Sequence, residues 1–219
     1  MSVIDIAAAN ESLQGLSPLE IVRWAIEQAP GRTIVSSNFR PYEAVLLHLC
    51  TRVQPDIPVL WVDHGCNRPA TYRHMANLTE RLGLNIKAYV PRQTAAHREA
   101  LEGPLPEPDD EAGLKRFSAT FKLEPFKRGM QELAPTIWLT ALRRVQNPNR
   151  EGMELVSADE TFRTIKVSPV LDLTDADMDA YLARYELPNE WDYWDPAKAD
   201  EKRECGLHVD WGAQAVKSS

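Results

Sequence analysis

The chain has 219 residues, of which 43% are hydrophobic and 26% charged, and its formal net charge is −7. A chain of this length and composition can bury a sizeable core as a globular protein. The acidic balance argues against bulk nucleic-acid binding, which depends on many lysine and arginine contacts to phosphates. Without an apolar run of ~20 residues or a basic region before an apolar start, we expect no membrane span, no secretory signal and a cytoplasmic location.

Short β-branched runs alternate with amphipathic helical stretches along the chain. This pattern predicts an α/β fold with a mostly parallel, twisted sheet and helices on both faces. Ser17 is expected to cap the first helix, with Pro18 at its first position. The expected strands lie at 33–37, 59–63, 85–90, 137–142 and 162–167, and further helices at 45–53, 72–82 and 174–185. Residues 102–113 and the chain after 185 are expected to be irregular.

The turn after the first expected strand is rich in hydrogen-bond donors. In open parallel sheets, ligands bind outside the carboxyl ends of the strands. Hydroxyls and backbone N–H groups at such a turn suit phosphate or sulfate, although simple helix capping is the alternative interpretation. The candidate binding residues of this turn are Ser36, Ser37, Asn38, Phe39 and Arg40.

The second expected strand ends in Asp63, and Gly65 follows shortly after. A carboxylate here can accept a hydrogen bond from a ribose or a base, and glycine allows a ligand to approach the backbone closely. We therefore count Asp63 and Gly65 as candidate binding residues. His64 is interpreted as a partly exposed loop histidine, and Cys66 as a small buried hydrophobe.

The fourth expected strand leads into a cationic segment. It holds Arg143, Arg144, Gln146 and Arg150, with no acidic residue before Glu151. Guanidinium groups bind phosphate and sulfate in a bidentate manner, so this segment predicts an oxyanion site. The alternative is a solvated charged surface, although such surfaces usually mix signs. Lys122 is a candidate for the same array.

The three cysteines, Cys50, Cys66 and Cys205, are widely spaced and form no CxxC pair. This argues against a disulfide framework and against a zinc or iron–sulfur site, so any redox chemistry must use single thiols. Cys205 stands beside a glycine and three positions before His208, and it follows Lys202 and Arg203. Cations favour the nucleophilic thiolate, which makes Cys205 the candidate nucleophile. An incidental cysteine on a solvated tail is the alternative.

These segments together resemble the phosphoadenosine phosphosulfate (PAPS) reductases, the thioredoxin-dependent enzymes of sulfate assimilation, across residues 33–208. The most specific match is KRECGLH at 202–208, which is similar to the family's carboxy-terminal catalytic signature. The other matching segments follow in the family's order. They are SSNF at 36–39, PDIPVLWVDHG at 55–65, PATY at 69–72, KLEPFKR at 122–128, LRRVQNPNR at 142–150 and KVSPVLDL at 166–173.

The resemblance implies an adenine nucleotide alpha hydrolase-like fold, with one nucleotide-binding domain over residues 1–219 and a mobile catalytic tail at 188–219. It also implies that Cys205 attacks the sulfur of the sulfonucleotide, and that thioredoxin or glutaredoxin reduces the resulting S-sulfocysteine to release sulfite. His208 would hold the substrate or keep the thiol ionised. The cationic residues would neutralise the substrate and the leaving adenosine 3′,5′-bisphosphate. A homodimer is compatible with the resemblance.

Related reductases that act on adenylyl sulfate bind an iron–sulfur cluster through cysteine pairs. Here Thr120 and Phe121 precede Lys122, and the tail holds only Cys205, so we expect no cluster, no other bound cofactor and PAPS as the substrate. Arg40 is the candidate contact for the 3′-phosphate, unless it caps a helix or pairs with Glu43.

Three alternatives to a PAPS reductase remain. One is a cluster-free adenylyl-sulfate reductase, and another is an altered nucleotide-binding paralogue, since residues 189–201 replace a longer family segment. The third is an ATP pyrophosphatase-type ligase or sulfurtransferase, which would need an SGGxDS loop that this chain lacks.

Overall fold

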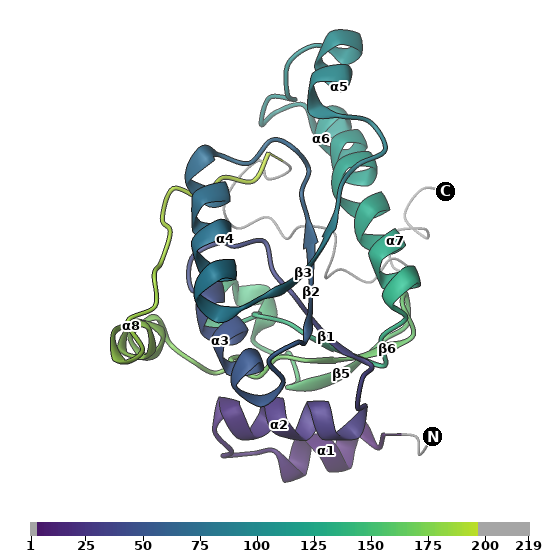
Figure 1. Cartoon of the computed structure of the whole chain (residues 1–219). Coiled ribbons are helices and arrows are strands. Elements are labelled where there is room, and N and C mark those ends of the chain that lie inside the picture. Colours follow the sequence, from purple (N-terminus) through teal and green to yellow (C-terminus); the bar gives the residue numbers. More distant parts are fainter. Residues whose placement is uncertain (1–3, 197–219) are drawn as a thin grey trace.

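A computed structural model describes residues 4–196 of the chain. This part contains a six-stranded sheet in the order β3-β2-β1-β4-β6-β5 (Figure 1). All neighbouring strands are parallel except β5 and β6, which are antiparallel. The strands are β1 (Thr33–Ser36), β2 (Pro58–Val62), β3 (Asn85–Tyr89), β4 (Ile137–Leu139), β5 (Val156–Asp159) and β6 (Thr164–Val167). The expected mostly parallel α/β sheet is therefore confirmed.

Helices cover both faces of this sheet (Figure 1). On one side of the sheet lie α1 (Ile6–Ser12), α2 (Pro18–Gln28), α3 (Glu43–Val53) and α4 (Pro69–Leu82), and α8 (Asp175–Arg184) packs against α3. The other face packs against α7 (Glu124–Leu133). The remaining helical segments are α5 (Ala95–Glu102), α6 (Glu111–Phe117), a π-helix at Ser118–Leu123 and 3-10 turns at Arg144–Gln146 and Pro148–Arg150. Within residues 4–196, no helix is long and apolar enough to cross a membrane.

Alternation along the central strands divides the core between the two faces, because successive side chains of a strand point to opposite sides. Val35, Val59 and Trp61 belong to the cluster under α2 and α3, whereas Ile34 and Leu60 belong to the cluster under α7. All five side chains are buried. Since both faces are covered, the strands appear in the sequence as nearly continuous apolar runs.

The helix boundaries agree with the sequence where capping chemistry is strong. Ser17 caps α2, and its backbone N–H donates to the Glu20 carboxylate at 2.8 Å. One expectation is wrong, because the segment 102–113, expected to be irregular, contains the start of α6 at Glu111. No element was expected at β5, nor at α1, α5 and α7. β5 is a four-residue edge strand of mixed burial, so its period-two pattern is too short to recognise.

The strand order reverses between β1 and β4. From β1 the chain continues outward through β2 and β3, whereas the later strands lie on the β4 side. Open α/β sheets form a ligand crevice outside the carboxyl ends of the strands at such a point. The turns that follow β1 and β4 therefore frame the place where a ligand site is expected.

Gly129 in α7 sits where this helix crosses the sheet. A Cβ atom there would lie 2.8 Å from Leu60 Cδ1 and 2.9 Å from Tyr89 Cδ2. We expect Gly129→Ala to lower the free energy of unfolding by about 1–3 kcal/mol through overpacking. Alanine's helix propensity would offset at most ~1 kcal/mol of this loss. Urea unfolding followed by circular dichroism measures the change. Gly152→Ala is the control, because no atom lies within 4 Å of its added Cβ, and equal losses in both variants would contradict the crowding.

Candidate functional site

The turn between β1 and α3 is organised around the carboxylate of Glu43. Its Oε2 accepts hydrogen bonds from the Ser37 hydroxyl and the Asn38 backbone N–H, both at 2.7 Å. Its Oε1 accepts from Arg40 Nε at 2.8 Å. The residue is only 6% exposed. The Ser37 and Asn38 donors, which the sequence analysis assigns to an anionic ligand, thus bind a carboxylate of the protein itself. Arg40 pairs with Glu43, which is the alternative role expected for it.

The other two candidate residues of this turn point into the protein. The Ser36 hydroxyl accepts from the indole N–H of Trp138 on β4 at 2.8 Å. Phe39 is fully buried, and its ring meets the ring of Trp61 edge-on with centroids 5.5 Å apart. Its φ of 56° lies in the left-handed region, which is strained for a side chain of this size. Phe39 can therefore offer a ligand only its backbone.

Asp63 anchors the loop that follows β2. Its Oδ1 accepts from the Gly65 N–H at 2.9 Å, from Asn67 Nδ2 at 3.3 Å and from the Tyr72 hydroxyl at 2.7 Å. Burial, together with the bond to Asp63, raises the pKa of Tyr72 to about 12. Gly65 has a φ of 74°, which is a conformation that favours glycine. One oxygen of Asp63 is thus engaged in fixing the loop.

Lys122 lies on the π-helix at Ser118–Leu123, a type of helix that is rare and frequently marks functional sites. Its Nζ donates to Asp195 Oδ2 at 2.6 Å, and both side chains are only 4% exposed. This is a buried ion pair between residues far apart in the sequence. Asp195 comes from the chain after α8, so that segment returns to the candidate site.

We call residues 186–196 the strap. It runs from α8 past the carboxyl edge of the sheet to the start of α4 (Figure 1). Polar contacts attach it to this edge: Asn189 Oδ1 accepts from the Tyr42 N–H at 2.9 Å, Asp192 pairs with Arg68, and Asp195 pairs with Lys122. The ring of Trp191 also packs edge-on against Tyr42. The candidate catalytic residues Cys205 and His208 follow the strap in sequence and lie outside the described residues.

His64 is buried beside this ion pair, with 4% of its surface exposed, so its interpretation as a partly exposed loop residue is wrong. Its Nδ1 accepts from the Cys66 N–H at 3.1 Å. Burial, assisted by the positive charge of Lys122, lowers the pKa of His64 from 6.5 to about 4, although Asp195 and Asp63 oppose the shift. The imidazole is therefore neutral at physiological pH.

The described cysteines are poor nucleophiles. Cys50 is fully buried, and burial raises the pKa of its thiol far above the ordinary value. Cys66 is half-buried, packs against the Phe117–Phe121 cluster, and also has a pKa raised by burial. A thiolate is the reactive form of cysteine, so neither residue is poised for attack at neutral pH.

The cationic segment after β4 is held by protein partners. Arg143 is 3% exposed, pairs with Asp175 at 2.7 Å, and lies over the ring of Tyr42 at 5.0 Å. Gln146 Oε1 accepts from the Arg143 N–H at 3.2 Å and from Arg150 Nη1 at 2.5 Å. These bonds bring Arg143, Gln146 and Arg150 together, close to Tyr42 at the start of α3. Within the described chain, the buried Nε of Arg143 has no hydrogen-bond partner.

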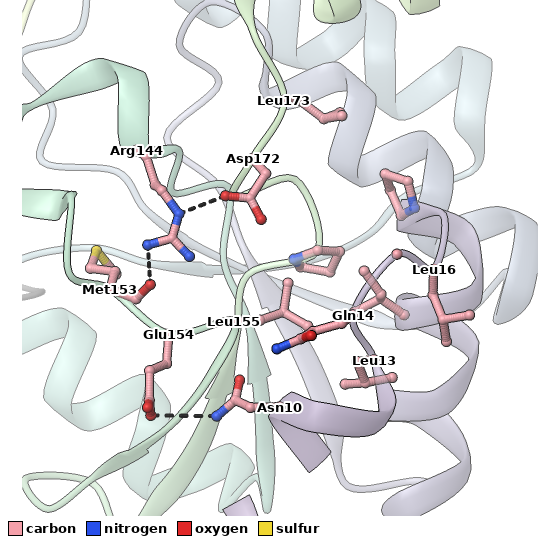
Figure 2. A pocket seen from close by; sticks show the side chains of 14 residues that line it. Asn10, Leu13, Gln14, Leu16, Arg144, Met153, Glu154, Leu155, Asp172 and Leu173 are labelled. Carbon is pink, nitrogen blue, oxygen red and sulfur yellow. Dashed lines mark hydrogen bonds and ion pairs between the residues drawn. The ribbon is translucent and has the colours of Figure 1, made fainter. Parts of the chain in front are cut away.

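Arg144 points elsewhere, into a cavity of about 360 Å³ (Figure 2). Its Nε donates to Asp172 at 2.6 Å, and its Nη1 donates to the backbone carbonyls of Glu151, at 2.8 Å, and Met153. The loop between α1 and α2 forms the opposite wall, with Leu13 and Leu16 labelled in Figure 2. The structure thus separates Arg144 from the other candidate residues.

Sequence reasoning missed Asp195 and treated Glu43 only as an alternative partner of Arg40. The Glu43 pair had a local signal, because Arg40 and Glu43 are three residues apart. Asp195 had none, because its partner Lys122 lies 73 positions away. For residues 4–196, no group of three or more histidine, cysteine, aspartate or glutamate side chains is placed to hold a metal ion.

Comparison with known sequences identifies the relatives of this chain. A profile of the phosphoadenosine phosphosulfate reductase domain matches residues 32–190. A curated phosphoadenosine 5′-phosphosulfate reductase from Synechococcus sp. is 35% identical, with 91% of this chain and 95% of the relative covered. The enzyme of the same name from Alkalilimnicola ehrlichii is 40% identical, with 84% of this chain and 74% of the relative covered.

Solved structures share the fold. A phosphoadenylyl-sulfate reductase from Candida auris, determined as a phosphate complex, is similar with a TM-score of 0.75 and 21% identity, covering 87% of this chain and 91% of that one. An FMN adenylyltransferase from Candida glabrata is similar with a TM-score of 0.57 and 12% identity, covering 83% and 63%. The expected adenine nucleotide alpha hydrolase-like fold is confirmed.

The buried His64 makes stability depend on pH. Its pKa is about 4 in the folded protein and near the ordinary 6.5 in the unfolded chain, so only the unfolded chain binds the proton between these values. Stability therefore falls as the pH drops from 6.5 towards 4. Over this range, the free energy of unfolding of His64→Asn should fall by about 2–3 kcal/mol less than that of wild type. The carbonyl of the Asn side chain can still accept from the Cys66 N–H.

Denaturant unfolding between pH 7.5 and pH 4.5 measures the His64 effect. His97→Asn, at an exposed position, is the control and should follow wild type. Superimposable pH profiles for wild type and His64→Asn would show that this histidine is not the group that titrates.

The strap makes one buried and one exposed ion pair, and substitutions can distinguish their contributions to stability. Asp195→Asn should lower the free energy of unfolding by about 1.5–3 kcal/mol, because it removes a charge-assisted bond from a buried ammonium. Asp192→Asn is the matched control, since the side chains of Arg68 and Asp192 are 49% and 54% exposed, and it should cost about 0–1 kcal/mol. Denaturant unfolding gives both values, and hydrogen exchange should accelerate in residues 189–195 only for Asp195→Asn. Indistinguishable variants would refute a stabilising role for the buried pair.

Proposed function

This chain belongs to the phosphoadenosine phosphosulfate reductase family, and from that membership we propose that it reduces 3′-phosphoadenylyl sulfate (PAPS) to sulfite and adenosine 3′,5′-bisphosphate. The chain is then an oxidoreductase of sulfate assimilation, with one nucleotide-binding domain. The observation that carries the proposal is the similarity, over most of the chain, to curated relatives that bear the name of this activity.

The proposed first step is nucleophilic attack by the Cys205 thiolate on the sulfur of PAPS. A bond forms between Sγ and this sulfur, and the bond from the sulfur to the phosphate oxygen breaks. Adenosine 3′,5′-bisphosphate leaves with the electron pair of that bond, and Cys205 carries an S-sulfonate. Support for Cys205 as the nucleophile comes from the raised pKa values of Cys50 and Cys66.

A dithiol protein such as thioredoxin or glutaredoxin supplies the two electrons in the second step. One of its thiolates attacks Sγ of Cys205, sulfite leaves with the electron pair of the sulfur–sulfur bond, and a mixed disulfide forms. The second thiol of the partner then resolves this disulfide, which releases the Cys205 thiolate and oxidised partner. The cycle balances without a bound flavin, metal or iron–sulfur cluster.

The proposed substrate site lies at the strand-order reversal, where Arg40, Lys122, Arg143 and Arg150 supply positive charge and Gln146 joins two of these arginines. Preorganised cations stabilise charge that develops on a leaving phosphate. Asn38, Asp63 and Gly65 would contribute polar contacts to the nucleotide, Arg40 would meet its 3′-phosphate, and His208 would act near the thiol. Arg144, bonded to Asp172 and to two backbone carbonyls, supports the segment and is not assigned a substrate contact.

Substrate binding would rearrange the charges around Lys122. Lys122 is only 3% exposed, and Asp195 neutralises its ammonium. An anionic group that binds Lys122 must displace the Asp195 carboxylate, and the strap with it. Because the strap precedes Cys205 in the sequence, movement of the strap would couple substrate binding to presentation of the nucleophile.

The covalent intermediate gives the decisive test. Incubation with PAPS in the absence of a reductant should add one SO₃ group to the protein by intact mass, and peptide mapping should assign it to Cys205. Cys205→Ser should form no adduct and no sulfite, whereas Cys66→Ser should form the adduct as wild type does. Addition of reduced thioredoxin should release one equivalent of sulfite. Adduct formation at Cys66 or Cys50 in Cys205→Ser would overturn the mechanism, and faster adduct formation with adenylyl sulfate would reassign the substrate.

A further inference from the structure

The carboxylate of Glu43 occupies the anion position of the turn between β1 and α3. A turn that joins a strand to a helix in an open α/β sheet binds anions through hydroxyls and backbone N–H groups. Here the Ser37 hydroxyl and the Asn38 N–H both donate to the same oxygen of Glu43, each at 2.7 Å. The turn therefore contains its own anion, covalently attached through the first turn of α3.

Because the turn is buried, a second anion cannot bind there beside Glu43. Glu43 is 6% exposed and Ser37 4% exposed, so little water is present to screen a second negative charge. Like charges in a poorly screened site repel strongly, and the two donors are already used. The second oxygen of Glu43 binds Arg40 Nε at 2.8 Å, which compensates the charge of the carboxylate and fixes the orientation of the guanidinium.

An ordinary helix-capping role does not account for the geometry. The N-cap residue of α3 is Tyr42, which has a left-handed backbone and no side-chain capping bond. The donors that Glu43 accepts from belong to the turn before the helix, at residues 37, 38 and 40. Glu43 thus organises the ligand-facing turn and does not satisfy the free N–H groups of its own helix.

We propose that Glu43 is a specificity-determining residue, which excludes pyrophosphate and the polyphosphate chain of a nucleoside triphosphate from this turn and positions Arg40 for the sulfonucleotide. The positioning part rests on the function proposed above. The exclusion part concerns the turn alone. With the Ser37 hydroxyl and the Asn38 N–H occupied by Glu43, phosphate groups are left to Arg40 and to the cations on the π-helix and after β4.

Glu20 provides a matched control for substitution of Glu43. It also lies in the first turn of a helix, and its Oε2 also accepts from a serine hydroxyl, at 2.6 Å, and from a backbone N–H, at 2.8 Å. Glu20 is exposed, however, and stands at the start of α2 before the sheet begins. The two glutamates make similar bonds, but only Glu43 fills the turn at the strand-order reversal.

Titration calorimetry with inorganic pyrophosphate tests the exclusion on the 219-residue chain. We expect Glu43→Ala, which vacates both donors, to bind pyrophosphate about tenfold more tightly than wild type or tighter still. Glu43→Gln removes the charge but keeps the shape, and should show a smaller gain. Glu20→Ala should bind as wild type does. Circular dichroism reports whether each variant folds, and if Glu43→Ala does not, Glu43→Gln decides.

Kinetics separate the exclusion from the proposed reaction. For PAPS, Glu43→Gln should raise KM by about tenfold with a smaller change in kcat, because the Arg40 orientation is lost. Pyrophosphate should inhibit this variant more strongly than wild type. A folded Glu43→Gln that binds pyrophosphate no better than wild type, or an equal gain in Glu20→Ala, would overturn the exclusion. An unchanged KM would overturn the positioning of Arg40. Failure of wild type to form sulfite would instead refute the proposed function and leave the pyrophosphate result to stand by itself.

Discussion

Cations buried at the carboxyl edge of the sheet need nearby negative charge, and the organisation of the site follows from that need. Removing an ammonium or guanidinium from water costs several kcal/mol unless a partner compensates it. Lys122 and Arg143 are each 3% exposed, and a carboxylate contacts each of them. In the proposed reaction, an anionic substrate would therefore enter a site where protein carboxylates already compensate the cations, and it would bind by exchanging with some of them.

The partners of these cations come from late in the chain, which ties the strap and α8 to the strand-order reversal. Asp175 at the start of α8 contacts Arg143, and Asp195 at the end of the strap contacts Lys122. A parallel sheet gathers turns that are distant in sequence at one edge, and the charges there hold the returning chain in place. The segment that precedes Cys205 is thus attached to the same groups that are proposed to bind the substrate.

Sequence patterns predicted elements and residue types better than partners. Period-two and helical spacing located β1 to β4, β6, α2 to α4 and α8, because both faces of the sheet demand apolar runs. The burial of His64 was not predictable, because it depends on Phe117 and on the Lys122–Asp195 pair, which only the folded chain brings next to it. Only part of the anchoring of the turn by Glu43 was predictable from the sequence. The contact with Arg40 is local, at i, i+3 spacing, whereas the bonds from Ser37 and Asn38 to the same oxygen depend on the bend after β1.

The two neighbouring arginines after β4 show why a dense run of one charge in sequence need not form one binding array. Arg143 has an extended backbone, with φ of −131° and ψ of 143°. In an extended segment, successive side chains point to opposite sides. Arg143 accordingly turns to Asp175 and the ring of Tyr42, whereas Arg144 turns to Asp172 and the cavity beside α1 (Figure 2). The guanidinium of Arg143 therefore faces the strand-order reversal. The guanidinium of Arg144 anchors the segment that carries both residues.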